Sequence, residues 1–184
     1  MDHSTTLDLS VSVPATTANL GPGYDTLGLA LDLRLTATAA ISDQWRVQLE
    51  GEGHTELPRD ESNLMIQAYQ RLCEHKGWDV SPLDLHVNNP IPLGRGLGSS
   101  AAAIVAGLAL AQLAHGGSLS REELFQHAHG MEGHGDNVGP ATFGGLQRIV
   151  GEGEGIKSQP CALHPAVKVL LVIPAQAKST VRMR

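Results

Sequence analysis

The pattern of apolar and polar positions predicts several half-buried strands. In residues 7–13, every second residue from Leu7 to Val13 is apolar and its neighbours are mostly polar. This is the period-two pattern of a strand with one buried face. Pro14 follows directly and is expected to end the strand, because proline has no amide hydrogen for a ladder bond. Further strands are predicted at residues 29–39, 45–49, 83–87 and 146–150.

Residues 167–173 are the most continuous apolar segment among the predicted strands. Only Lys168 is polar in the run VKVLLVI, and Pro174 stops it. Such a run is typical of a strand buried in a sheet, yet few residues remain after it to form a pairing strand. We therefore expect an apolar edge that a second copy of the chain covers, that is swapped between protomers, or that makes the chain prone to aggregation. A homodimer is favoured over a monomer.

Apolar residues at helical spacing predict a first helix after residue 60. Leu64, Ala68 and Leu72 recur every fourth residue, which places them on one face of a helix. The helix is expected to end at His75 or Lys76, before Gly77. Asp60 and Ser62 precede this series, and side chains of their type accept hydrogen bonds from the free amides of a first turn. Either residue is therefore expected to cap the helix.

Two more helices are expected after residue 98. Residues 99–114 are rich in alanine and apolar nearly all round, which is typical of a central helix covered on most sides. Ser120 with Glu123 three residues later matches a capping box and predicts the start of another helix. Gly133 and Gly135 are expected to turn the chain after that helix.

Composition and charge limit the classes of partner. Thirteen Lys and Arg against nineteen Asp and Glu give a formal net charge of -6, and no basic run is present, so nucleic acid is not an expected partner. The apolar run 101–111 is too short for the roughly 20 residues that span a membrane. Cys73 and Cys161 form no metal or disulfide motif, and residues 1–10 do not resemble a signal peptide. A cytoplasmic protein is expected.

A composition change near residues 151–160 predicts a domain boundary. Glycine and polar residues dominate this stretch, as they do in many linkers between domains. We expect one domain over residues 1–158 and the start of a second over residues 159–184.

Residues 92–102, with the sequence PLGRGLGSSAA, have the composition of a phosphate-binding loop. Three glycines and two serines lie between a predicted strand and a predicted helix. Glycines allow the backbone to approach an anion, and the amides at a helix N-terminus favour phosphate. Neither the Gly-Lys-Ser/Thr of a P-loop nor the spacing of a dinucleotide-binding fold is present. A tight glycine turn before a helix capped by Ser99 or Ser100 is the structural alternative.

The whole segment resembles the second motif of the GHMP kinases, a family of ATP-dependent small-molecule kinases. The resemblance implies an α+β fold with a ribosomal protein S5 domain 2-like N-terminal domain and a left-handed βαβ unit. The start of a ferredoxin-like second domain would follow. ATP would be bound by Pro92, Leu93, Gly94, Arg95, Gly96, Leu97, Gly98, Ser99, Ser100, Ala101 and Ala102.

Two further segments are similar to the homoserine kinase branch of this family. They are PATTANLGPGYDTLGLAL at residues 14–31 and EGHGDNVGPATFGG at residues 132–145. The resemblance implies that Ser100 and Glu132 hold Mg²⁺, and that L-homoserine is the substrate. The implied substrate-binding residues are Asn19, Asp25, His134, Asn137, Thr180 and Arg184.

The chemistry of these residues agrees with an amino-acid substrate. A carboxylate such as Asp25 suits an ammonium group, and an arginine such as Arg184 suits a carboxylate. The amide of Asn137 cannot take a proton at neutral pH, so no classical base is expected. Asp25 and Asn137 are the expected catalytic residues, and their role would be to orient the substrate hydroxyl. Taken alone, Asp25 also fits a turn and Arg184 a solvated terminus. Two alternative functions remain. The protein could be a kinase of the same family that acts on another small alcohol, or the chain could be a non-catalytic fragment that binds a nucleotide.

Overall fold

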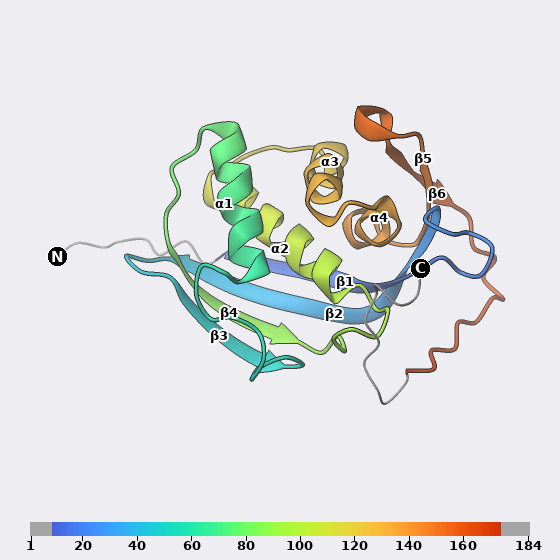
Figure 1. Cartoon of the computed structure of the whole chain (residues 1–184), viewed down its shortest axis with the longest axis horizontal. Coiled ribbons are helices and arrows are strands. Elements are labelled where there is room, and N and C mark those ends of the chain that lie inside the picture. The colour runs from blue at the N-terminus through green and yellow to red at the C-terminus, as the bar shows by residue number, and fades with distance from the viewer. Residues whose placement is uncertain (1–8, 174–184) are drawn as a thin grey trace.

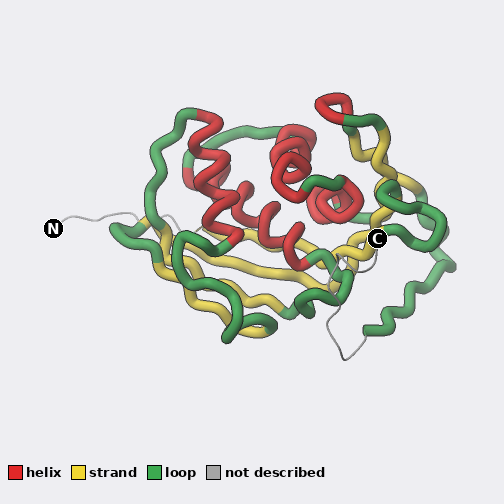
Figure 2. The backbone as a smooth tube through the Cα atoms, viewed as in Figure 1, coloured by secondary structure: helices red, strands yellow, loops and turns green. Residues whose placement is uncertain are grey.

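The computed structural model describes residues 9–173, which form an α+β fold with one layer of helices on one face of a sheet (Figures 1 and 2). This confirms the fold class expected from the sequence. The described elements run in the order β1 (Leu9–Ala18), β2 (Leu27–Ile41), β3 (Arg46–Gly51), α1 (Leu64–Lys76), β4 (Leu83–Asn89), α2 (Ser99–Ala114), α3 (Arg121–Glu132), α4 (Gly135–Phe143), β5 (Leu146–Val150), η1 (Gly153–Gly155) and β6 (Lys157–Cys161).

The long strand β2 organises the sheet. It pairs antiparallel with β1 along most of its length, with β4 over residues 36–41, and with β5 over residues 27–29. β3 pairs parallel with β4, so β3, α1 and β4 form the βαβ unit, and β6 extends the sheet beyond β5. The strand order is β3-β4-β2-β5-β6, and β1 also pairs with β2. The sheet therefore depends on β2, which pairs with three other strands.

β1 does not end at Pro14, so that expectation was wrong. The strand continues to Ala18, and Pro14 lies opposite Arg34. The register with β2 shifts between Pro14 and Thr16. Proline is tolerated at such an irregularity, because the regular ladder is already interrupted there.

The helices begin and end close to the positions that the sequence predicts, with one change at the first cap. Asn63, and not Asp60 or Ser62, caps α1: its Oδ1 accepts a hydrogen bond from the Met65 amide at 3.0 Å. Asp60 instead accepts from the amide and the hydroxyl of Ser62 in the preceding turn. The predicted capping box of α3 is present as expected.

α2 is the central helix of the layer, and its bounds agree with the predicted range 99–114. It packs against α1, α3 and β1. A side chain at Gly107 would collide with the backbone oxygen of Met65 in α1, so glycine allows these two helices to approach closely. The small residues of α2 therefore serve dense packing in a core that has few aromatic side chains.

The helix α4 was missed by sequence reasoning. Gly133 does end α3, with a left-handed φ of 87°, but Gly135 begins α4 instead of adding a second turn. A side chain at Gly135 or Gly139 would meet Ile149 of β5 within 3 Å. Glycine at these two positions allows the helix to pack closely on the strand. A prediction from local sequence instead treats glycine as a helix breaker.

Residues 167–173 are not a strand, so the prediction for this segment was wrong. No described strand pairs with it, and Leu170 is 87% exposed. Val169 and Leu171 lie beside residues 29–33 of β2, around an apolar hollow of about 390 Å³. An apolar run predicts burial, but a strand also needs a hydrogen-bonding neighbour. The expected domain boundary at 158/159 falls inside β6 and stays a prediction.

Candidate functional site

The loop after β4 forms a cavity at the N-terminus of α2. Gly94, Gly96 and Gly98 have φ values of 63°, 72° and 65°, so every second residue adopts the left-handed conformation that favours glycine. The cavity has a volume of about 160 Å³ and is lined by Pro92, Gly94, Arg95, Gly96, Leu97, Gly98, Ser99, Ser100, Glu132 and Asn137. Of the segment 92–102, Leu93, Ala101 and Ala102 do not line it.

The N-terminus of α2 has no side-chain cap. Its N-cap residue is Gly98, which cannot supply one, and the first helical bond runs from the Ala102 amide to the Gly98 carbonyl at 2.9 Å. The amides of residues 99–101 therefore have no partner within the helix. Together with the helix dipole, they make this end of α2 suited to bind a phosphate group.

Two buried polar residues hold the loop in place. The Thr16 amide in β1 donates to the Leu97 carbonyl at 3.0 Å. Asn89, at the end of β4 and 2% exposed, accepts from the Ile91 amide at 3.2 Å and donates to Ser99 Oγ at 3.4 Å. Sequence reasoning missed Asn89, although the alternation of β4 places residue 89 on the buried face of the sheet.

Ser100 and Glu132 bring two helix ends together at the cavity. Ser100 Oγ lies 2.7 Å and 2.5 Å from the two carboxylate oxygens of Glu132, and its hydroxyl donates to this carboxylate. Ser100 belongs to the first turn of α2 and Glu132 is the last residue of α3. Hydroxyl and carboxylate oxygens are the hard ligands that Mg²⁺ prefers. The oxygen chemistry of this pair would therefore suit a Mg²⁺ ion beside the loop.

Asn137 lies in the first turns of α4 and also lines the cavity. Its Oδ1 accepts a hydrogen bond from Thr16 Oγ1 at 2.8 Å. Gly98 leaves room for this hydrogen bond, because a side chain at position 98 would collide with Thr16 Oγ1. The loop after β4 (residues 92–102), β1 and α4 thus meet at one point.

The connection between β1 and β2 carries Asn19 and Asp25. Asn19, Leu20 and Asp25 have positive φ values of 69°, 40° and 50°, a conformation that is costly for leucine. Asn19 Oδ1 accepts a hydrogen bond from the Asp25 amide at 2.8 Å. The two residues are thus held next to each other by a strained loop, which is a common feature of binding sites.

Asp136 is a buried acid beside this loop that sequence reasoning did not single out. Its side chain is 3% exposed, and its Oδ1 has no hydrogen-bond partner among the described residues. Burial raises the pKa of Asp136, the charge of Asp25 raises it further, and His134 opposes the shift. His134 immediately precedes α4 as its N-cap residue. The only sequence signal was an acid between two predicted site residues, His134 and Asn137.

The remaining predicted residues and histidines contribute less. Thr180 and Arg184 lie outside the described residues. The ring of His127 contacts His75 of α1, with ring centroids 4.7 Å apart. Within residues 9–173, no group of three or more His, Cys, Asp or Glu residues could hold a metal ion.

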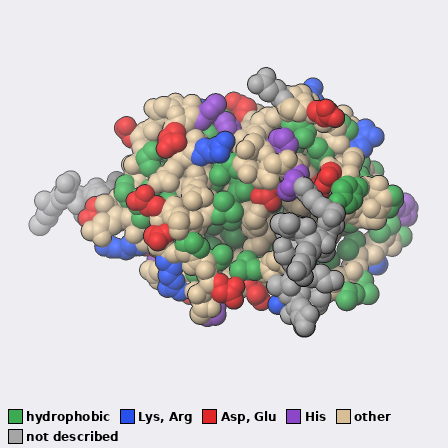
Figure 3. Space-filling model, viewed as in Figure 1, with side chains coloured by type: hydrophobic (Ala, Val, Ile, Leu, Met, Phe, Trp, Pro, Cys, Tyr) green, Lys and Arg blue, Asp and Glu red, His purple; other side chains and the backbone are tan. Residues whose placement is uncertain are grey.

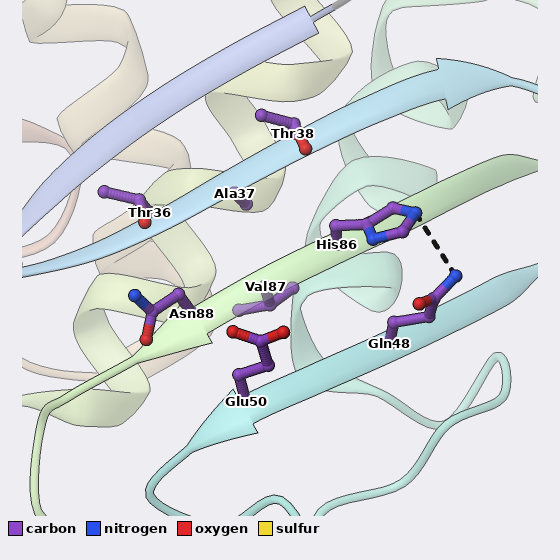
Figure 4. A pocket seen from close by; sticks show the side chains of 8 residues that line it. All are labelled: Thr36, Ala37, Thr38, Gln48, Glu50, His86, Val87 and Asn88. Atoms are coloured by element: carbon purple, nitrogen blue, oxygen red, sulfur yellow. Dashed lines mark hydrogen bonds between the residues drawn. The ribbon is translucent and has the colours of Figure 1, made fainter.

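A second hollow lies on the open face of the sheet, away from the helices (Figure 4). Polar side chains of β2, β3 and β4 line it, including Gln48, whose Nε2 lies 3.2 Å from His86 Nε2. Its walls are neighbouring strands whose backbone groups are already paired. It therefore offers no free helix end or loop amides, and the loop cavity is the better candidate for the functional site.

On the face shown in Figure 3, Lys and Arg side chains are scattered among Asp and Glu and form no continuous basic surface. None of the helices within the described part of the chain is long and apolar enough to cross a membrane.

The chain is similar to known proteins in both sequence and fold. Residues 63–145 match the model of the GHMP kinases N terminal domain. The chain is 44% identical over 180 residues to a homoserine kinase of Clavibacter michiganensis, covering 96% of this chain and 57% of that protein. It is 50% identical over 134 residues to a homoserine kinase of Thermus thermophilus, covering 73% and 45%.

The crystal structure of homoserine kinase from Cytophaga hutchinsonii superimposes with a TM-score of 0.75 at 26% identity, covering 100% of this chain and 65% of that chain. The chain thus spans about half of the length of the curated relatives it matches. It belongs to the GHMP kinase family, and it carries that family's N-terminal domain.

Proposed function

We propose that the protein carrying this chain transfers the γ-phosphate of ATP to the side-chain hydroxyl of L-homoserine, giving O-phospho-L-homoserine, a step of threonine biosynthesis. The observation that carries the proposal is the uncapped N-terminus of α2, which opens into a glycine-lined cavity beside Glu132 and Asn137. Several relatives of 38% to 50% identity are homoserine kinases by name, which supports the choice of substrate.

The loop amides and the first turn of α2 would bind the phosphates of ATP. Ser100 and Glu132 would hold Mg²⁺ through their oxygen atoms, which lie within hydrogen-bonding distance of each other. When bound, Mg²⁺ neutralises charge on the phosphates. Because this transfer depends mainly on position and charge stabilisation, the site needs fixed hydrogen-bond donors more than a strong base.

Asp25 and Asn137 would orient the acceptor hydroxyl, and a phosphate oxygen would receive its proton. The buried Oδ1 of Asp136 has no hydrogen-bond partner among the described residues, and after burial the charge of Asp25 also contributes to raising the pKa of Asp136. An ammonium group between them would relieve this repulsion. We infer that Asp136 joins Asn19, Asp25 and His134 at the amino-acid end of the site.

The remaining expectations belong to the whole protein. Thr180 and Arg184 would bind the substrate carboxylate, the protein would act in the cytoplasm, and two copies would form a homodimer. Each of these rests on the resemblance and on the sequence.

A coupled assay for ADP release tests the function directly. The natural protein that carries this sequence is supplied with ATP, Mg²⁺ and either L-homoserine or mevalonate, and the product is identified by phosphorus NMR. We expect O-phospho-L-homoserine and no turnover of mevalonate. ADP release that does not depend on homoserine would contradict the proposal.

A further inference from the structure

We propose that Thr16 is a positioning residue that fixes the amide of Asn137, so that Asn137 acts on the reacting groups as a hydrogen-bond donor. The inference rests on the proposed phosphotransfer and adds a residue to its site. Thr16 is fully buried, and it bonds to both sides of the cavity: its amide to Leu97 of the loop, and its hydroxyl to Asn137 of α4.

The surroundings of Thr16 leave its hydroxyl little freedom. A buried hydroxyl needs a partner, since water cannot supply one, and the partner that the structure provides is Asn137 Oδ1 at 2.8 Å. The β-branched side chain restricts rotation about χ1. Gly98 packs directly against the Thr16 hydroxyl, in a space that no larger residue could share. The hydroxyl is therefore held in one position.

This contact determines which end of the Asn137 amide is available. A primary amide has one carbonyl acceptor and an NH₂ group with two donors. Because Thr16 occupies Oδ1, the NH₂ group is the end left for the cavity that Asn137 lines. A fixed donor at this place can stabilise negative charge on a phosphoryl oxygen or on the acceptor oxygen. A carboxylate at position 137 would place negative charge there instead.

Four variants of the natural protein test the inference. Thr16→Val keeps the shape and removes the hydroxyl, Thr16→Ser keeps the hydroxyl, and Asn137→Asp keeps the acceptor for Thr16 but removes the NH₂ group. Thr142→Val is the matched control, because Thr142 of α4 donates only to the Val138 carbonyl of its own helix, at 2.7 Å.

For Thr16→Val we expect kcat to fall on the order of 10- to 100-fold, as for other residues that orient a catalytic group, with little change in KM for either substrate. Thr16→Ser should restore most of kcat, and Thr142→Val should keep it. Asn137→Asp should be at least as impaired as Thr16→Val at every pH. If Thr16→Val keeps the wild-type kcat, or if Asn137→Asp becomes active as pH rises, the inference is wrong.

A binding measurement separates this inference from the proposed substrate. ADP with aluminium fluoride mimics the transferring phosphoryl group, and calorimetry gives its affinity beside that of ADP alone. In Thr16→Val, ADP should bind as in wild type, while the gain from aluminium fluoride should fall on the order of 10-fold or more. An unchanged gain overturns the inference, even if the wild-type protein does not phosphorylate homoserine. Wild-type protein that binds neither ligand would overturn both proposals.

Discussion

At the scale of single residues, Gly96 and Gly98 of the loop after β4 differ in how tightly their neighbours pack around them. Gly96 and Gly98 both have positive φ, but a side chain at Gly96 would meet nothing within 4 Å, whereas one at Gly98 would collide with Thr16. A residue with a Cβ atom would therefore be strained in the left-handed conformation at either position, and at position 98 it would also collide with Thr16. This difference makes them a matched pair for mutation.

We predict that Gly96→Ala lowers the free energy of unfolding by about 1 to 2 kcal/mol, the cost of the left-handed conformation for a residue with a Cβ atom. Gly98→Ala should lower it clearly more, because Thr16 must also move and Asn137 must give way slightly. Urea denaturation of the two variants measures the difference. Equal losses would mean that the contact between Gly98 and Thr16 is not tightly packed.

The buried acid Asp136 should make stability depend on pH. Its pKa is raised in the folded protein, so the folded state is favoured while the group is protonated, and this contribution is lost as pH rises through the raised pKa. We therefore predict that Asp136→Asn stabilises the protein near pH 7 and has little such effect below about pH 4, the ordinary range of an aspartate pKa. Denaturation midpoints at the two pH values test this, and an equal effect at both would contradict it. The same variant should weaken homoserine binding.

At the scale of elements, the C-terminus of α3 carries a charge of the unfavourable sign. Glu132 is the last residue of this helix, where the helix dipole disfavours a carboxylate. An acid that costs stability at this position is consistent with a role in metal binding. The hydrogen bond from Ser100 partly offsets the cost.

We predict that Glu132→Gln raises the free energy of unfolding by about 0.3 to 1 kcal/mol in the absence of metal. The same change should raise the Mg²⁺ concentration needed for half-maximal activity and lower turnover on the order of 100-fold. Glu122→Gln is the control, because Glu122 lies in the exposed first turn of the same helix. A Mg²⁺ dependence equal to that of the control would remove Glu132 from the proposed metal site.

Local signals in the sequence explain which elements could be predicted. The bounds of α2 follow from glycines at both ends and an apolar sequence between them. α4 could not be found in this way, because Gly135 and Gly139 suggest a turn until the close approach of β5 is known. Residues 167–173 show the reverse, since apolar character alone does not supply a pairing strand.

Some residues of the candidate site could also be predicted from the sequence, and others could not. Ser100, Glu132 and Asn137 were identified from segments that resemble the family's motifs, and the structure brings all three to one cavity. Thr16 and Asn89 were not identified, because their importance depends on contacts with residues distant in the sequence or across a loop. Such contacts cannot be derived from a single sequence, because they form only when the chain folds.

At the scale of the whole molecule, residues 163–173 leave an apolar surface beside β2. Leu170 and Val172 are both more than 80% exposed. Because the chain spans about half of its curated relatives, we predict that residues 1–184 form dimers or larger assemblies and turn over homoserine far more slowly than a full-length relative such as the homoserine kinase of Thermus thermophilus. Light scattering and the coupled assay measure the two properties. A monodisperse monomer with comparable turnover would contradict both parts.

The hydrogen bond between Thr16 and Asn137 joins residues 121 positions apart, and this separation affects how the cavity is assembled during synthesis. The ribosome adds roughly 5 to 20 residues per second, and N-terminal segments can begin to fold first. β1, β2 and the loop that ends at Ala102 can therefore emerge about 2 to 7 seconds before α4 begins at Gly135. Until α4 docks, Thr16 has no acceptor at Asn137 and the loop lacks one wall, so a nascent chain should acquire tight nucleotide binding only near the end of this domain's translation.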